Sequence, residues 1–173
     1  MFNLGFTVQY VEGIRLEIIS DWMLSVNTTL RTRLWSGCGA VAVRLENPLV
    51  DPNTTRPDIC ILMAEKLKEY LTEDEFNAIL EHELAHIRNG DLDNLQISKK
   101  MKIQVNMDYE MAADQAAVAK YGAATLLSAL TKIRRAQIEN LLFIKNKKVV
   151  DFICRVFVDK VTRKRLAVLK QAI

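Results

Sequence analysis

The pattern of apolar and polar residues predicts a mixture of short strands and amphipathic helices. Alternating side chains favour a strand at residues 5–11, and short apolar runs favour strands at 40–45 and 59–63. Residues 12–30 place apolar side chains at helical spacing, which predicts an amphipathic helix. All three Pro residues fall within residues 47–57, so we expect a loop there.

The clearest helix is expected to begin after Thr72. Thr72 followed by Glu75 three residues later fits a capping box, in which each residue satisfies a backbone N–H of the first turn. The helix should run to about Asn89, with Gly90 as its left-handed stop. On a helical wheel, Glu81 falls on the side expected to face solvent.

The sequence pattern after residue 90 predicts mainly helices. We expect helices at about 91–121, with a break near 106–108, at 123–140, and within 149–170. The sequence therefore predicts a helix-rich α+β fold with a small antiparallel or mixed sheet beside the capped helix. No interdomain linker is visible, so we expect a single domain over residues 1–173.

Composition narrows the class of protein. The chain has 173 residues, of which 50% are hydrophobic and 26% charged, a balance typical of a globular protein rather than a disordered one. Three widely spaced Cys do not suggest a disulfide framework. No signal peptide and no apolar run of membrane-spanning length is apparent. We therefore expect a soluble, cytoplasmic protein with no membrane insertion.

The charge is distributed unevenly. Residues 141–173 carry nine Lys and Arg and two Asp, whereas residues 1–140 carry 15 Lys and Arg and 19 Asp and Glu. This basic C-terminal helical segment is able to attract nucleic acid or an acidic partner. The simpler interpretation is a solvated helix face.

The strongest chemical signal lies within the capped helix. His82, Glu83 and His86 form the pattern His-Glu-x-x-His, and no other His occurs in the chain. Residues four apart share a helix face, so the two imidazoles are able to hold one Zn²⁺. Glu83 is displaced around the helix, where it is able to act as general base towards a zinc-bound water. The alternative is a pair of surface His without a metal.

A third ligand is expected further along the chain. Glu110 and Asp114 lie one turn apart on a predicted helix. Glu110 is the expected ligand, and Asp114 is able to accept the other ring N–H of a ligating His. Asp108 is the nearest competitor of Glu110. The alternative is a pair of solvated carboxylates on a helix surface.

These residues carry a family resemblance. Residues 82–91 (HELAHIRNGD), followed by Glu110-x-x-Ala113-Asp114, resemble the HtpX and CAAX prenyl endopeptidase family of zinc metallopeptidases. Peptidases of the BlaR type share the first block. Residues 162–169 (TRKRLAVL) resemble the terminal arginine element of the family, with Arg165 at its Arg. The resemblance covers roughly residues 40–169.

The resemblance implies a gluzincin, a zincin whose third ligand is Glu. His82, His86 and Glu110 would then be the ligands and Glu83 the catalytic base. The membrane helices of those relatives and the His-Pro pair before the terminal Arg are missing, so the chain resembles a minimal, soluble version. Zincin-like folds bind substrate as an added strand, for which residues 40–45 or 59–63 are candidates.

The sequence thus predicts a zinc-dependent metalloendopeptidase that hydrolyses peptide or protein substrates. Tyr109, Tyr121 and Arg165 are the candidate donors to the oxyanion, with Arg165 favoured as a catalytic residue by the resemblance. One alternative is a zinc-stabilised binding or regulatory module that contacts nucleic acid or an acidic partner without turnover. Another is a repressor-cleaving regulator of the ImmA type, although no helix-turn-helix module is evident.

Overall fold

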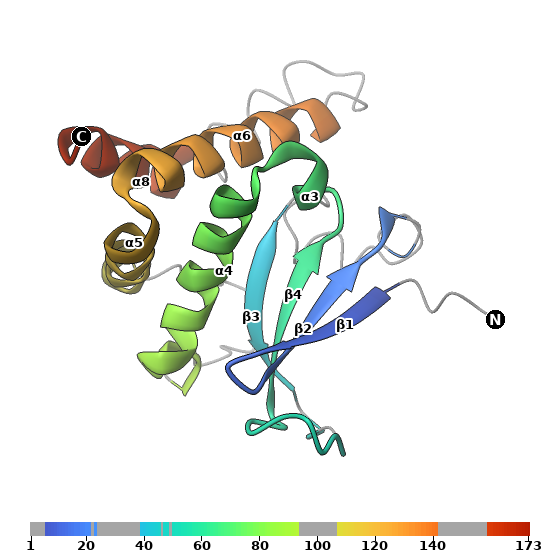
Figure 1. Cartoon of the computed structure of the whole chain (residues 1–173). Helices are drawn as coiled ribbons and strands as arrows, with labels where there is room; N and C mark the ends of the chain where they lie inside the picture. Colours follow the sequence, from blue (N-terminus) through green and yellow to red (C-terminus); the bar gives the residue numbers. More distant parts are fainter. Residues whose placement is uncertain are drawn as a thin grey trace. The chain divides into compact units, whose positions relative to one another are not determined.

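The computed structural model divides the chain into two compact units, Met1–Tyr70 and Leu71–Ile173. The first unit holds a four-stranded sheet and the second holds the long helices (Figure 1). The α+β fold class is therefore confirmed, while the single domain over residues 1–173 stays a prediction. The structure describes residues 6–21, 23, 39–45, 47–48, 50–93, 107–141 and 159–173.

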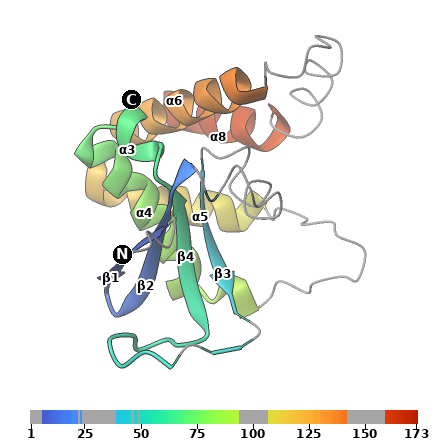
Figure 2. The same ribbon diagram turned by 90° about the vertical axis from the view of Figure 1, so that its right-hand side faces the viewer.

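The sheet of the first unit is mixed. It pairs β1 and β2 antiparallel, β2 and β4 parallel, and β4 and β3 antiparallel, in the order β1-β2-β4-β3. Figure 2 shows β4 between its two neighbours, so residues 59–63 do not form a sheet edge. The strands are β1 (Phe6–Val11), β2 (Ile14–Ile19), β3 (Ala40–Arg44) and β4 (Ile59–Ala64), and the short helix α3 (Leu67–Tyr70) follows.

The helix predicted over residues 12–30 is wrong in its described part, because residues 14–19 form strand β2. Glu12 and Gly13 both have positive φ, 53° and 73°. That is the conformation of a two-residue hairpin turn between antiparallel strands. Beyond the turn, Ile14, Leu16 and Ile18 are buried in alternation with half-buried polar residues. The rest of the predicted helix lies mostly outside the described residues.

The second unit is a helical assembly in which α4 packs against α5 and α6, and α8 packs against α6 and α5. No helix of the described residues is long and apolar enough to cross a membrane. The elements are α4 (Glu73–Arg88), the 3₁₀ turn η1 (Asp91–Asp93), α5 (Met107–Tyr121), α6 (Ala123–Leu141) and α8 (Asp159–Gln171).

The helix boundaries predicted from the sequence agree with the structure in some places and differ in others. The prediction at 123–140 is confirmed by α6. Of the helix predicted at about 91–121 with a break near 106–108, residues 91–93 form a 3₁₀ turn and residues 107–121 form α5. Residues 94–106, between these two elements, lie outside the described residues.

The capping box at the start of α4 is confirmed. The Thr72 hydroxyl accepts a hydrogen bond from the Glu75 N–H, and the Glu75 carboxylate accepts one from the Thr72 N–H. Glu75 also accepts hydrogen bonds from Ser128 (2.6 Å) and Lys132 (2.7 Å) on α6. The cap therefore fixes where α4 begins and joins it to α6.

The prediction that Glu81 faces solvent is wrong. Its side chain is 6% exposed and pairs with Arg88 on α4 and with Lys120 Nζ on α5 at 2.8 Å. Lys120 and Arg88 are themselves about half exposed. The long basic side chains therefore reach in from the surface and satisfy a carboxylate that α5 covers.

Candidate metal centre

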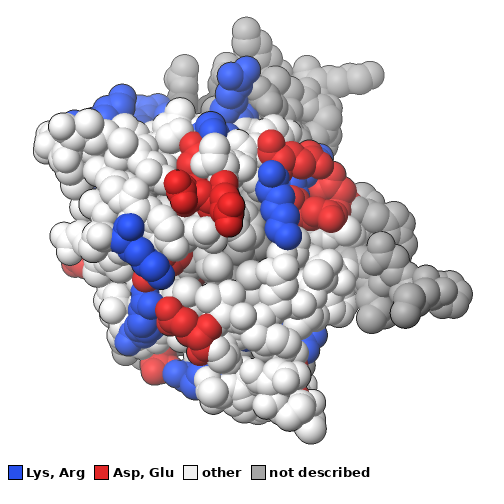
Figure 3. All heavy atoms as spheres, viewed as in Figure 1, with Lys and Arg blue, Asp and Glu red and all other residues white. Residues whose placement is uncertain are grey.

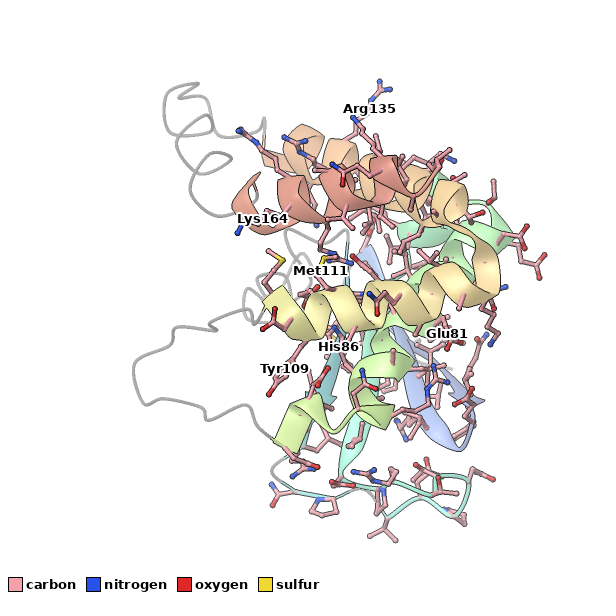
Figure 4. The ribbon with its side chains drawn as sticks, turned by 90° about the vertical axis from the view of Figure 1, so that its left-hand side faces the viewer. Glu81, His86, Tyr109, Met111, Arg135 and Lys164 are labelled. Carbon is pink, nitrogen blue, oxygen red and sulfur yellow. The ribbon has the colours of Figure 1, made fainter. Side chains whose placement is uncertain are left out.

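The centre is built from side chains of α4, α5 and α8, all within the second unit. The motif residues His82 and His86 lie one turn apart on α4, and Glu110 comes from the first turn of α5. In Figure 4, His86 and Tyr109 lie towards the same end of the α4–α5 pair, whereas Glu81 lies towards the other. The capping box at Thr72 and Glu75 fixes where α4 begins, and α4 carries both imidazoles one turn apart.

His82, His86 and Glu110 each offer one potential ligand atom, and these three atoms form a triangle in which all lie within 4.8 Å of one another. His82 Nε2 and His86 Nε2 are 3.1 Å apart. The two oxygens of Glu110 lie 3.4 Å from His82 Nε2 and 3.5 Å from His86 Nε2. Zn²⁺ bonds of 2.0–2.1 Å in a tetrahedron require ligand atoms about 3.3 Å apart. The donor set of two imidazole nitrogens and one carboxylate suits a zinc ion, and its atoms are close enough together to hold one.

The outer nitrogen of each ring faces a carboxylate. His82 Nδ1 lies 3.0 Å from Asp114 Oδ1, and His86 Nδ1 lies 2.7 Å from Asp91 Oδ2. An ionised carboxylate only accepts hydrogen bonds, so Asp114 and Asp91 favour the tautomer of each ring that carries its proton on Nδ1. In the neutral tautomer this leaves Nε2 with a free lone pair, and both lone pairs belong to the triangle.

Asp91 is a site residue that sequence reasoning missed. The residue after Gly90 was interpreted as the start of a second helix, with no role in the site. The position of Asp91 directly after Gly90 could have indicated its role. A Gly at the end of a helix reverses the chain and brings the following residue back towards the last turn. Asp91 is 6% exposed, which is unusual for Asp without a partner.

Arg165 of α8 contacts both acids of α5. Its Nε and Nη2 atoms donate to the two oxygens of Asp114 at 2.8 and 2.6 Å, and its Nη1 lies 2.8 Å from a Glu110 oxygen. Nη2 also lies 3.3 Å from His82 Nδ1. The guanidinium therefore lies against the candidate ligands His82 and Glu110, and the Arg165 side chain is 11% exposed.

Glu83 is buried, with 8% of its surface exposed. Its negative charge raises the pKa values of both His82 and His86. The carboxylate is therefore close enough to both rings to act on them electrostatically.

The pKa shifts of His86 and Glu110 show that the centre stabilises positive charge on the rings and negative charge on the carboxylate. Burial lowers the pKa of His86, but its hydrogen bond to Glu110 and the charge of Glu83 raise it to about 9. Burial raises the pKa of Glu110, but the two imidazoles and Arg165 hold it well below its usual range. The acidic side chains around the two rings therefore favour positive charge at this centre, which a divalent cation would supply.

Two further residues from the sequence analysis do not belong to the triangle. Asp108, the competitor of Glu110, has an exposed side chain and is absent from the only metal-binding group found among the described residues. Tyr121 lies eleven residues after Glu110 on the same helix, which separates them by about 16 Å along its axis. Tyr109 neighbours Glu110 in sequence.

Comparison with known proteins gives one family. The model of Peptidase family M48 matches residues 54–151, which is more than half of the chain. The chain belongs to Peptidase family M48. The matched part includes α4 and α5, which supply His82, Glu83, His86 and Glu110, but not Arg165. No curated protein and no solved structure matches the chain.

Membership of M48 confirms the zinc metallopeptidase resemblance at the level of the family and indicates a hydrolase. The narrower resemblance to HtpX and the CAAX prenyl endopeptidases stays a prediction. His82, His86 and Glu110 place their ligand atoms within 4.8 Å of one another, close enough to hold a metal ion.

Proposed function

We propose that this M48 member is a zinc-dependent endopeptidase that hydrolyses peptide bonds in peptide or protein substrates. The observation that carries the proposal is the cluster of His82, His86 and Glu110, whose three potential ligand atoms lie within 4.8 Å of one another. Zinc bound there would act as a Lewis acid, lowering the pKa of water and polarising the peptide carbonyl.

Glu83 is the proposed general base. It would accept a proton from the attacking water as the C–O bond forms, and would then deliver that proton to the amide nitrogen as the C–N bond breaks. Its position directly after His82 on α4 places it beside the ligands but around the helix from them. Burial supports this role, because proton transfer is favoured where bulk water is excluded.

The oxyanion donor is proposed to be Arg165 or Tyr109, since Tyr121 is too far along α5. Arg165 already has its guanidinium beside Glu110. Arg165→Lys and Tyr109→Phe separate the two possibilities. The variant that removes the donor lowers kcat while zinc content and KM stay close to wild-type values.

The experiment that tests the proposal compares wild-type protein with Glu83→Gln on an unfolded, fluorescently quenched protein substrate. Wild-type protein should cleave it, a zinc chelator should abolish cleavage, and added Zn²⁺ should restore it. Glu83→Gln should keep its zinc and lose cleavage by a factor of at least about 10². Asp74→Asn, an exposed acid on the same helix, is the matched control and should stay active.

The same experiment separates the alternative from the proposal. Stoichiometric zinc without cleavage of any member of a broad peptide library would contradict the endopeptidase proposal. It would favour the zinc-stabilised binding or regulatory module instead.

A further inference from the structure

The two histidines are held by carboxylates in different ways. Asp114, which faces His82, shares its charge with Arg165 through two short hydrogen bonds. Asp91, which faces His86, has that ring as its one ion-pair partner among the described residues. Asp91 therefore directs its charge at a single imidazole, at the shortest carboxylate–imidazole distance of the centre (2.7 Å).

The backbone brings Asp91 to this position. The last turn of α4 ends at Asn89, whose N–H donates to the Ala85 carbonyl. Gly90 follows with φ of 72°, a left-handed conformation that turns the chain back. Asp91 then opens the 3₁₀ turn η1 and is buried, whereas Asp93 at the other end of η1 is exposed.

We propose that Asp91 is a positioning residue of the metal centre, which holds the His86 ring by accepting its Nδ1–H and so presents Nε2 to the ion. The proposal rests on the proposed zinc site. A neutral imidazole exists in two tautomers and rotates about its side-chain bonds, and only one tautomer in one orientation offers Nε2 to the triangle. A carboxylate on the other nitrogen fixes both and makes the ring a stronger donor.

The test measures zinc affinity by chelator competition in wild type, Asp91→Asn and Asp91→Ala. Asp91→Ala should bind zinc 10–100-fold more weakly than wild type. Asp91→Asn retains an acceptor oxygen without the charge, so its loss should be smaller. Asp93→Asn makes the same charge change two residues later at an exposed position and should stay within about twofold of wild type.

A second readout follows the proton of the His86 ring itself. In zinc-loaded wild-type protein with ¹⁵N-labelled His, His86 should carry its proton on Nδ1, shifted downfield and slow to exchange. In Asp91→Ala that resonance should disappear, while the Nδ1 proton of His82, held by Asp114, should remain. A purely structural role of Asp91 in closing α4 would not separate the two rings in this way.

The outcomes distinguish this inference from the proposed function. Wild-type protein that binds zinc, with Asp91→Ala of equal affinity, would overturn the role of Asp91 and leave the zinc site standing. Wild-type protein that binds no zinc would overturn both. If Asp91→Ala does not fold, the wild-type spectrum decides, and a His86 ring protonated on Nε2 would overturn the proposal.

Discussion

Arg165 is the residue whose contribution to stability is easiest to isolate. Its guanidinium contacts Asp114 and Glu110 where all three side chains are mostly buried. Removing one partner of a buried ion pair leaves uncompensated charge, which typically costs 3–5 kcal/mol. Arg165→Ala should therefore lower the free energy of unfolding of the metal-free protein by about 3 kcal/mol, measured by urea denaturation followed by helical circular dichroism.

The control for this variant lies on the same helix. Arg163 of α8 is exposed, so Arg163→Ala should change the free energy of unfolding by no more than about 0.5 kcal/mol. Equal effects of the two substitutions would show that Arg165 does not balance the buried acids.

At the scale of single residues, the sequence predicted those candidate site residues that belong to a short motif with fixed spacing. His82, Glu83 and His86 follow from a five-residue pattern on one helix face. Asp91 was missed because its role depends on a backbone reversal at Gly90, and Glu81 was misplaced because its burial depends on α5 covering it. A helical wheel contains neither the turn after the helix nor the packing of another helix against it.

The turn after α4 provides a prediction at the scale of elements. Gly90 has φ of 72°, and an added Cβ would meet nothing closer than 3.6 Å, so the cost of Gly90→Ala is conformational rather than steric. The substitution should cost about 1 kcal/mol of unfolding free energy and weaken zinc binding, because it disturbs the turn that places Asp91.

Gly122 supplies the matched control for that turn. It joins α5 to α6 with φ of 85° and open space at its Cβ. Gly122→Ala should therefore carry a similar stability cost, measured by denaturation, without a change in zinc affinity. Identical zinc affinities for the two variants would contradict the link between the Gly90 turn and the metal.

The contact of Glu75 on α4 with Ser128 and Lys132 on α6 predicts that the free energy of unfolding depends on pH. Burial raises the pKa of Glu75, but hydrogen bonds from Lys132, Ser128 and the Thr72 N–H outweigh it and lower the pKa overall. A carboxyl with a depressed folded-state pKa stabilises the protein above its unfolded pKa of about 4.3, and this contribution is lost as the pH falls through the folded value.

Glu75→Gln should therefore differ most from wild type near pH 7, and the difference in unfolding free energy should shrink as the pH falls below about 4. Urea denaturation of both proteins from pH 7 to pH 3 measures this. Glu73→Gln, at an exposed position of the same first turn, should show a small and nearly constant difference. A Glu75→Gln difference independent of pH would contradict the assignment.

Elements were predictable where local signals agreed with packing. For α4, the cap, the stop and the apolar periodicity all indicate one helix, and the structure has it. For residues 14–19, apolar residues fit helical spacing as well as a strand, and pairing with β1 and β4 decides the outcome. Such pairing is set by segments distant in sequence, so the local pattern alone could not select it.

At the scale of the whole molecule, zinc binding should be coupled to unfolding. A ligand that binds only the folded state stabilises it by about 4 kcal/mol at 1,000 times its Kd, which for a chain of this size corresponds to a Tm shift of roughly 10 °C. Removing zinc with a chelator should therefore lower the helical unfolding midpoint by that order, as measured by circular dichroism.

The two tryptophans make the same experiment a test of domain organisation. Trp22 and Trp35 both lie within residues 1–70, whereas the proposed zinc ligands lie in the second unit. If residues 1–173 form a single cooperative domain, tryptophan fluorescence and circular dichroism should shift together on chelation. A tryptophan fluorescence transition whose midpoint does not change when zinc is removed would contradict the single-domain prediction.

Surface charge bears on the prediction of an anionic partner. Arg163, Lys164 and Lys170 of α8 are exposed, while Arg165 is taken up by the metal centre. On the face drawn in Figure 3, acidic and basic side chains of the described residues are interspersed. Binding to nucleic acid or an acidic protein stays a prediction, and DNA binding that persists at 0.2 M salt would support it.

The zinc content of purified wild type, Glu110→Ala and Asp108→Ala tests the central claim most directly, because Glu110 is the ligand contributed by a second helix. The account predicts about one zinc per chain in wild type and in Asp108→Ala, and almost none in Glu110→Ala, measured by metal analysis after gel filtration. Wild-type zinc content in Glu110→Ala would contradict the ligand set, and with it the chemistry assigned to the centre.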